Sequence, residues 1–294
     1  LPMGFMTNSA LASWQVDENE DQFNPFDKQN EFFKLATGIK DDVYTPLDVV
    51  SQGHTDYNQF PVNKTGYGRY SFSCTDTTVT PHVKWNYEAP KDGLYLMYAD
   101  ISGGDDVTVM INDVAQSKTY GMGRSYIACI GQCKKGDKIS VYSNLQQGQS
   151  GSAMVFVDVL NQDVFEEGYN KLSKSVMTTT KLTGSSMEGT INAQENGLFY
   201  TSVPYEEGWK AYVDGKEVKI TPVGNALVAF NLAKGEHTIK LEYYPKGFAI
   251  GLTVTIICAA TFAFLCVWTY IIKKRRKKKG DISENPEEVQ INAE

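Results

Sequence analysis

Two pairs of adjacent carboxylates are the side chains of this sequence best suited to acid–base chemistry or metal binding. Asp105-Asp106 follows two glycines, and Glu206-Glu207 precedes Gly208. Glycoside hydrolysis needs two carboxyl groups about 5 to 10 Å apart across a cleft, whereas neighbouring side chains in a strand diverge. The sequence therefore does not support a hydrolase, and no residue is assigned a catalytic role. Asp105 and Asp106 are weak candidates for calcium ligands, because calcium takes about six to eight oxygen ligands and a solvated turn accounts for the pair as well.

Aromatic side chains indicate where a carbohydrate could bind, because tryptophan and tyrosine rings offer flat apolar surfaces with a polar edge. The candidate glycan contacts are Trp85, Tyr205, Glu206 and Glu207. For Trp209, the alternation of residues 208–213 predicts a place in the core. The sequence contains no glycine-rich phosphate loop and no nucleophile elbow, and we expect no cofactor.

Cysteines and histidines are too scattered for a metal centre. Cys129 and Cys133 are close enough for a tight hairpin to bridge, so a disulfide and two separate thiols both stay open. Cys74 has no evident partner, and Cys258 and Cys266 lie in an apolar segment, where they act as apolar fillers. The three histidines are far apart in the sequence, and none has the spacing of a zinc ligand.

An uncharged segment of 25 residues, Phe248–Ile272, is followed directly by the basic run Lys273–Lys279. About 20 apolar residues are enough to cross the hydrocarbon core of a lipid bilayer, and a lysine and arginine cluster beside a span stays in the cytoplasm. We therefore predict one transmembrane helix, with residues 1–247 extracytoplasmic and the C-terminus cytoplasmic.

The residues before this basic run carry an excess of negative charge. Seven of the 28 basic and five of the 35 acidic residues follow Ile272, which leaves 21 basic and 30 acidic residues before Lys273, a net charge of −9. An acidic surface does not attract phosphate backbones, so we expect no nucleic-acid partner. Leu1–Met6 lacks the basic start and the apolar length of a signal peptide, and we expect either a cleaved signal or an upstream membrane segment to precede it.

Alternating β-branched and aromatic residues, separated by Gly, Asp and Asn turns, predict a mostly β fold before the apolar segment. One ordered series of motifs occurs twice: a Gly-Leu-aromatic start, an Asn-Asp or Asp-Gly hairpin, and a Lys-Gly-acid turn. The first copy is Gly93-Leu94-Tyr95, Asn112-Asp113 and Lys135-Gly136-Asp137, and the second is Gly197-Leu198-Phe199, Asp214-Gly215 and Lys234-Gly235-Glu236. We therefore predict two tandem β-sandwich modules of jelly-roll type, followed by a single C-terminal transmembrane α-helix.

Domain boundaries are predicted from the repeat and the apolar segment. They are a membrane-proximal N-terminal segment at 1–42, the first β-sandwich at 43–160, a linker at 161–180, the second β-sandwich at 181–247, the transmembrane helix at 248–272 and a cytoplasmic basic and acidic tail at 273–294. We expect the N-terminal segment to pack along the base of the sandwiches or to reach back toward whatever precedes Leu1.

Several stretches carry a family resemblance. The runs Phe199–Tyr205, Gly208–Val218, Lys234–Ile239 and Tyr244–Gly251 resemble the C-terminal end of the bacterial YfhO membrane protein family. Leu1–Phe5 and Asn24–Asn30 look like segments that follow the last of the family's earlier membrane helices. The resemblance covers nearly the whole chain, and Ser51–Thr180 is its least specific part.

This resemblance implies a role in the cell envelope. Family members are large polytopic proteins similar to GT-C glycosyltransferases. They are implied to transfer a sugar from an undecaprenyl-phosphate carrier to a cell-surface glycopolymer such as lipoteichoic acid, in the membrane of a Gram-positive bacterium. The acidic catalytic loops of such enzymes lie near N-terminal membrane helices, so the resemblance implies a non-catalytic, accessory part packed beside upstream membrane helices.

Two alternatives stay open. One is a membrane-anchored carbohydrate-binding or adhesion module without catalysis, and the other is a structural domain that contacts no sugar. The complete open reading frame separates the transferase from the adhesin, because many upstream hydrophobic spans indicate the first and a single signal peptide indicates the second.

Overall fold

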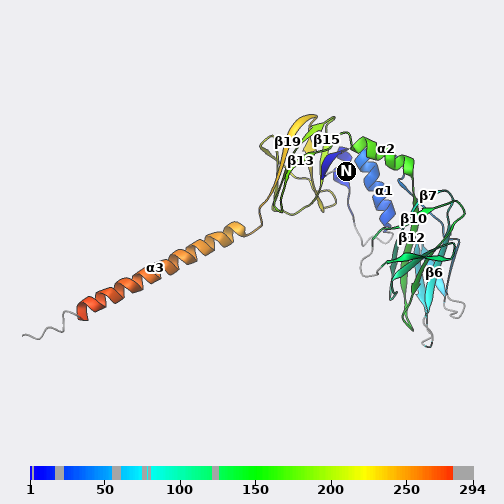
Figure 1. Cartoon of the computed structure of the whole chain (residues 1–294), viewed down its shortest axis with the longest axis horizontal. Helices are drawn as coiled ribbons and strands as arrows, with labels where there is room; N and C mark the ends of the chain where they lie inside the picture. Colours follow the sequence, from blue (N-terminus) through cyan, green and yellow to red (C-terminus); the bar gives the residue numbers. More distant parts are fainter. Residues whose placement is uncertain are drawn as a thin grey trace, which may run out of the picture. The chain divides into compact units, whose positions relative to one another are not determined.

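The computed structural model describes residues 1, 3–16, 23–54, 61–74, 78, 81–120 and 126–280. In this part of the chain β-strands predominate (Figure 1). It also contains the short helices η1 (Ser9–Ser13), α1 (Pro25–Thr37) and α2 (Gln162–Leu172), and its last element is the long helix α3 (Phe248–Gly280). The predicted mostly β fold with one C-terminal apolar helix is therefore confirmed.

The first module consists of two antiparallel sheets that share one core. One sheet has the strand order β10-β7-β12-β5-β4, with β2 paired to β12, and the other has the order β3-β6-β11-β8-β9. Strict alternation in β6 buries Val83, Trp85 and Tyr87, which meet Tyr95 and Val157 of the facing sheet. The strands are β2 (Tyr44–Pro46), β3 (Ser51–His54), β4 (Val62–Gly66), β5 (Arg69–Ser73), β6 (His82–Glu88), β7 (Gly93–Ile101), β8 (Val107–Ile111), β9 (Val114–Tyr120), β10 (Ala128–Cys133), β11 (Lys138–Asn144) and β12 (Ser150–Leu160).

The second module also contains two sheets, with strand orders β1-β15-β18 and β13-β14-β19-β16-β17. Its strands are β1 (Gly4–Thr7), β13 (Thr178–Leu182), β14 (Ser186–Ala193), β15 (Gly197–Pro204), β16 (Trp209–Val213), β17 (Lys216–Val218), β18 (Leu227–Leu232) and β19 (Gly235–Tyr243). Phe199 and Phe230 of the first sheet are fully buried, as are Ile239 and Leu241 of the second. Strand β1 pairs antiparallel with β15, so the start of the N-terminal segment contributes an edge strand to this module.

Helix α1 contacts both modules. It begins at Pro25 after an Asn24 side chain that accepts the Phe26 amide at 3.0 Å, and it ends at Gly38, whose φ of +73° suits glycine. Phe26 packs with aromatic residues of the first module, and Ala36 belongs to a cluster with Leu198 of the second. Because apolar residues occur at both ends of the helix, α1 packs against the outer face of the first module and against a cluster of the second.

The predicted internal repeat has a structural counterpart. Asn112-Asp113 and Asp214-Gly215 both have positive φ at their two central residues, which defines type I′ hairpins. In the first module Asn112 Oδ1 accepts the Lys138 amide at 2.9 Å, and in the second Asp214 Oδ1 accepts the Thr238 amide at the same distance. Each hairpin is therefore clamped to a later strand by an equivalent side chain, as expected of two related modules.

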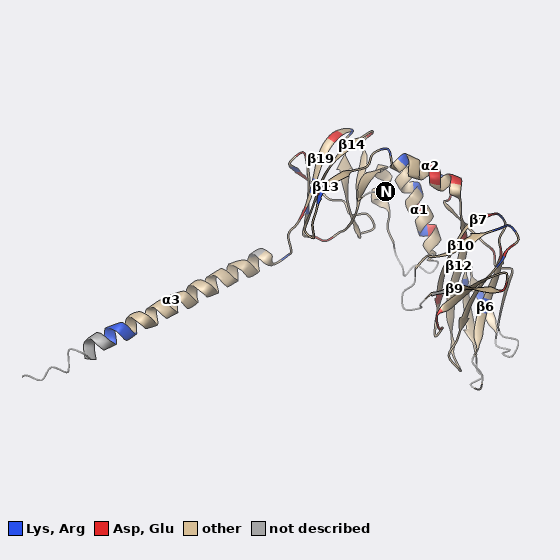
Figure 2. Cartoon of the chain, viewed as in Figure 1, with Lys and Arg blue, Asp and Glu red and all other residues tan. Residues whose placement is uncertain are grey.

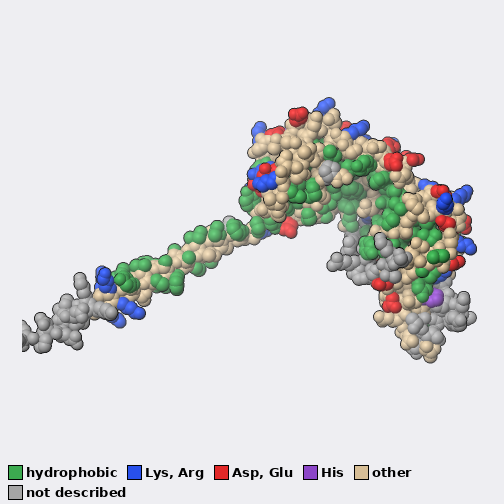
Figure 3. Space-filling view, viewed as in Figure 1, with side chains coloured by type: hydrophobic (Ala, Val, Ile, Leu, Met, Phe, Trp, Pro, Cys, Tyr) green, Lys and Arg blue, Asp and Glu red, His purple; other side chains and the backbone are tan. Residues whose placement is uncertain are grey.

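Helix α3 has an apolar surface. Residues Ile250–Arg276 are long and apolar enough to cross a membrane, and none of this span is buried within the described chain. Its basic residues gather at the C-terminal end, while apolar side chains cover the preceding turns (Figures 2 and 3). The hydroxyl groups of Thr255 and Thr261 donate to carbonyl oxygens four residues earlier, both at 2.8 Å, which satisfies them where water is absent.

Candidate functional site

The predicted acids Glu206 and Glu207 lie in a loop that packs against the residues leading into α3. We call this arrangement the collar and define it as residues 206–210 and 242–246, which with α3 form one compact unit. The Tyr244 amide donates to the Gly208 carbonyl at 2.9 Å, and the Trp209 amide closes the loop onto the Glu206 carbonyl at 3.0 Å. Backbone hydrogen bonds therefore hold this loop against the start of the membrane segment.

Side chains reinforce the collar. The Tyr243 hydroxyl donates to Glu206, and Lys246 forms an ion pair with Glu207. The hydrogen bond to Glu206 raises the pKa of Tyr243. The ring of Tyr243 also lies 5.2 Å from that of Trp209, centroid to centroid. Both predicted acids are thus engaged by neighbouring side chains.

Gly208 permits the close approach of the loop. A Cβ atom at this position would collide with the carbonyl oxygen of Tyr244 and lie against the ring of Tyr243. Glycine is therefore required for packing here, although its backbone conformation is ordinary. No local sequence pattern predicts this requirement, because the contact is with residues about 35 positions later.

The remaining predicted glycan contacts do not share one surface. Tyr205 precedes the collar, is half-buried, and donates its backbone amide to the Ala226 carbonyl at 2.7 Å. Trp85 is 0% exposed in the core of the first module, against Tyr70. A glycan cannot reach this ring, so Trp85 is left out of the candidate site. Trp209, expected in the core, is half-buried in the collar instead.

The other predicted residues lie apart from the collar. Asp105 and Asp106 are exposed at the turn before β8, and among the described residues no three His, Cys, Asp or Glu side chains are placed to hold a metal ion. Cys129 and Cys133 are free thiols on the same strand, one exposed and the other buried. Burial raises the pKa of the Cys133 thiol to about 11, which makes it unreactive at neutral pH.

A histidine–aspartate pair resembles a catalytic dyad but lacks an open face. His237 Nδ1 lies 2.7 Å from Asp214 Oδ2, and His237 Nε2 lies 3.1 Å from the Ala233 carbonyl oxygen. A general base needs a free ring nitrogen toward its substrate, and here both nitrogens are engaged. Hydrogen bonds from the Thr238 amide and from His237 lower the pKa of Asp214. The pair therefore fixes the hairpin of the second module.

The burial of the Asp158 carboxyl group was not predicted from the sequence. This residue is 1% exposed, and its Oδ1 has no hydrogen-bond partner among the described atoms. It shares the outer face of β12 with Phe156, which packs against Phe26 of α1. Burial raises the pKa of Asp158 to about 7, with a smaller contribution from the negative charge of Asp27 in α1.

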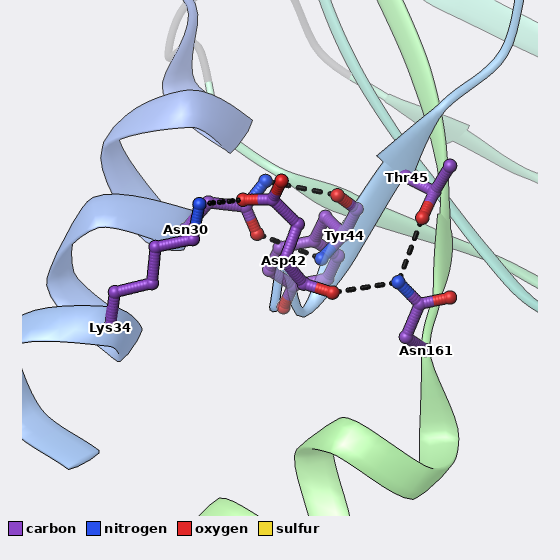
Figure 4. Close-up of polar contacts among 6 residues, drawn as sticks. All are labelled: Asn30, Lys34, Asp42, Tyr44, Thr45 and Asn161. Atoms are coloured by element: carbon purple, nitrogen blue, oxygen red, sulfur yellow. Dashed lines mark hydrogen bonds and ion pairs between the residues drawn. The ribbon is translucent and has the colours of Figure 1, made fainter. Parts of the chain in front are cut away.

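Amide side chains hold residues 42–45 against α1 and against the end of β12 (Figure 4). Asn30 donates to the Tyr44 carbonyl at 2.9 Å and accepts the Tyr44 amide at 2.8 Å. Asn161 donates to the Asp42 carbonyl at 2.7 Å and to Thr45 Oγ1 at 2.8 Å. These groups satisfy one another, so they serve as a structural joint and offer no ligand site.

Comparison with known proteins gives a match over most of the chain. A family model described as "Bacterial membrane protein YfhO" matches residues 1–255. The "Uncharacterized protein YfhO" of Bacillus subtilis (strain 168) is 29% identical over 136 residues, which are 42% of this chain and 14% of that protein. The chain therefore spans a small part of the length of this relative.

Similarity to solved structures is low. A family 35 carbohydrate binding module from Clostridium thermocellum gives a TM-score of 0.27 at 12% identity, over 40% of this chain and 96% of that one. An anti-sigma factor domain-containing protein gives 0.23 at 12% identity, over 65% and 87% of the two chains. A GH2 beta-galacturonidase from Eisenbergiella tayi gives 0.23 at 9% identity, over 68% and 38%. Scores of this size carry no argument about function.

Proposed function

This chain belongs to the bacterial YfhO membrane protein family, and on that premise we propose that it is the extracytoplasmic region and last membrane helix of a YfhO-type glycosyltransferase. The proposed reaction of the parent protein transfers a sugar from an undecaprenyl-phosphate carrier to a cell-surface polymer such as lipoteichoic acid. In this proposal residues 1–247 face the cell exterior, and the basic end of α3 faces the cytoplasm.

One observation carries the proposal: the family match runs through both modules and reaches α3, which begins at Phe248. The matched region therefore includes both β modules and the first turns of α3. An apolar helix attached to an acidic β-rich region suits an enzyme whose donor is lipid-linked and whose acceptor lies outside the membrane.

The role proposed for this region is accessory. Glu206 and Glu207 are engaged by Tyr243 and Lys246, which suits binding better than proton transfer. We propose that Tyr205, Glu206 and Glu207 contact the acceptor glycopolymer, with the exposed carboxylates accepting hydrogen bonds from sugar hydroxyls.

Sugar transfer is tested in membranes from cells that produce the complete protein. Membranes with the intact gene should move radiolabelled sugar from undecaprenyl phosphate into polymer, and membranes from a deletion strain should lose this activity. Equal transfer in both preparations would refute the assignment as a transferase.

Glycan contact is tested separately by NMR on the isotopically labelled chain in lipid nanodiscs. Titration with a soluble polymer fragment should shift the resonances of residues 205–207, and the E206Q/E207Q variant should weaken binding about tenfold, the loss of one or two charge-assisted hydrogen bonds. The matched D105N/D106N variant removes two exposed acids elsewhere and should bind as the wild type does. Unmoved resonances at 205–207 would contradict the contact while leaving the transfer result intact.

A further inference from the structure

The collar has a second face whose chemistry suits lipid. Trp209 is half-buried, with its ring packed against that of Tyr243. Tyr244 is 54% exposed, and Phe248 at the start of α3 is 65% exposed. Rings that combine an apolar body with a polar group are concentrated where hydrocarbon meets headgroups.

The chain length between the collar and the helix limits how far these rings can lie from the bilayer. Phe248 comes four positions after Tyr244, and four extended steps span at most about 14 Å. The connection is folded, because the Phe248 amide bonds to the Pro245 carbonyl at 3.2 Å and Gly247 has a φ of +81°. Tyr244 therefore lies less than about 14 Å from the start of α3, the segment that enters the bilayer.

The backbone contact between Tyr244 and Gly208 carries the loop to the same depth. Since the loop and the start of α3 belong to one compact unit, Trp209 moves with the helix. The ion pair of Glu207 with Lys246 and the hydrogen bond of Glu206 with Tyr243 neutralise or satisfy both loop acids. The loop can therefore approach a polar lipid surface without leaving a bare carboxylate there.

We propose that the collar is a lipid-contact surface, with the Trp209 indole among the headgroups of the bilayer that α3 crosses. Its partner is a zwitterionic phospholipid, whose phosphate and ester oxygens accept the indole N–H. This surface rests on α3 crossing a bilayer and is independent of the sugar-transfer reaction. It makes the entry of α3 a folded structure held by the collar in place of a free linker.

The test uses the full chain with 5-fluorotryptophan in nanodiscs of phosphatidylcholine, with and without a nitroxide label on the headgroup. Each tryptophan gives one fluorine resonance, and the W209F variant assigns that of Trp209. Trp209 should be broadened by the label as strongly as Trp268 near the other end of α3, whereas Trp85, enclosed in a protein core, serves as the unaffected reference.

A second variant tests whether the close approach of Gly208 to Tyr244 sets the depth of Trp209. Gly208→Ala leaves Trp209 in place in the sequence but removes the close contact with Tyr244, so broadening of the Trp209 resonance should fall. A Trp209 resonance as sharp as that of Trp85 in labelled nanodiscs would overturn the proposal. So would a Trp209 resonance that responds to added glycopolymer and not to the lipid label, because the occupant of the surface would then be a glycan.

Discussion

Replacing Asp158 by asparagine should make the first module more stable at neutral and alkaline pH. The carboxyl group is buried without a partner for Oδ1, and its pKa rises from 3.8 to about 7. A pKa that is higher in the folded chain than in the unfolded chain means that the folded state favours the protonated acid. The contribution of Asp158 to the free energy of unfolding is therefore fully present below about pH 4 and is lost as the pH rises through about 7.

The size of this loss follows from the shift. Raising the pKa of Asp158 from 3.8 to about 7 corresponds to ~4 kcal/mol of free energy of unfolding lost on the alkaline side. An asparagine has nearly the shape of the neutral acid and does not ionise. Position 158 of the variant should therefore contribute no pH dependence to the free energy of unfolding between about pH 4 and pH 8. Asp158→Asn and the wild type should therefore agree within ~1 kcal/mol at pH 4 and differ by up to ~4 kcal/mol at pH 8.

Hydrogen exchange of the full chain in nanodiscs measures this locally, in peptides covering β12. Protection factors corrected for intrinsic rates at each pH give the opening free energy of the strand. Asp105→Asn, which removes an exposed carboxylate of the same module, should follow the wild type within ~0.5 kcal/mol. Equal pH dependence in Asp158→Asn and the wild type would show that the carboxyl group is ionised at no cost, and the argument from burial would be wrong.

Three further substitutions or reactions test the packing. Trp85→Ala should destabilise the first module by about 3–5 kcal/mol in urea unfolding, because it empties a core position that is 0% exposed; an effect below ~1 kcal/mol would contradict that placement. Gly208→Ala should weaken protection of the Tyr244 amide by about 1–3 kcal/mol in hydrogen exchange, and unchanged protection would refute the close contact. Cys129 should react with maleimide in the native chain while Cys133 reacts only after denaturation, and a disulfide would leave both unlabelled under non-reducing conditions.

Local sequence patterns predicted the structural features that depend only on residues close together in the chain. The Asn112-Asp113 and Asp214-Gly215 hairpins follow from residue types that tolerate positive φ, and the structure places them equivalently. The apolar length of 248–272 likewise predicts α3, because spanning a bilayer depends on length and hydropathy alone. The domain boundaries as a set stay a prediction.

Trp85 and Trp209 both lie elsewhere than predicted. Val83, Trp85 and Tyr87 alternate as a buried face, a signal in the sequence that favours the core over a glycan surface. Trp209 alternates with the buried Ala211 but stands at the first residue of β16, where the loop leaves the module. Alternation therefore predicts burial correctly only inside a strand. At the end of a strand, the burial of a side chain depends on the path of the adjoining loop.

Asp158 and β1 depend on contacts that no local pattern encodes. Asp158 is buried because α1, more than a hundred residues earlier, covers the outer face of β12. Strand β1 pairs with residues 198–201, almost two hundred positions away. Short-range propensity carries no information about such pairings, since they arise from tertiary packing.

The pairing of β1 with β15 makes the first sandwich an insertion. Strand β1 belongs to the second module, and the chain leaves this module after β1 and returns to it at β13. A pulling force applied at β1 and at α3 would therefore act on the second sandwich before the first. The force would then pass through the hydrogen bonds between β1 and β15 and leave the inserted sandwich unloaded.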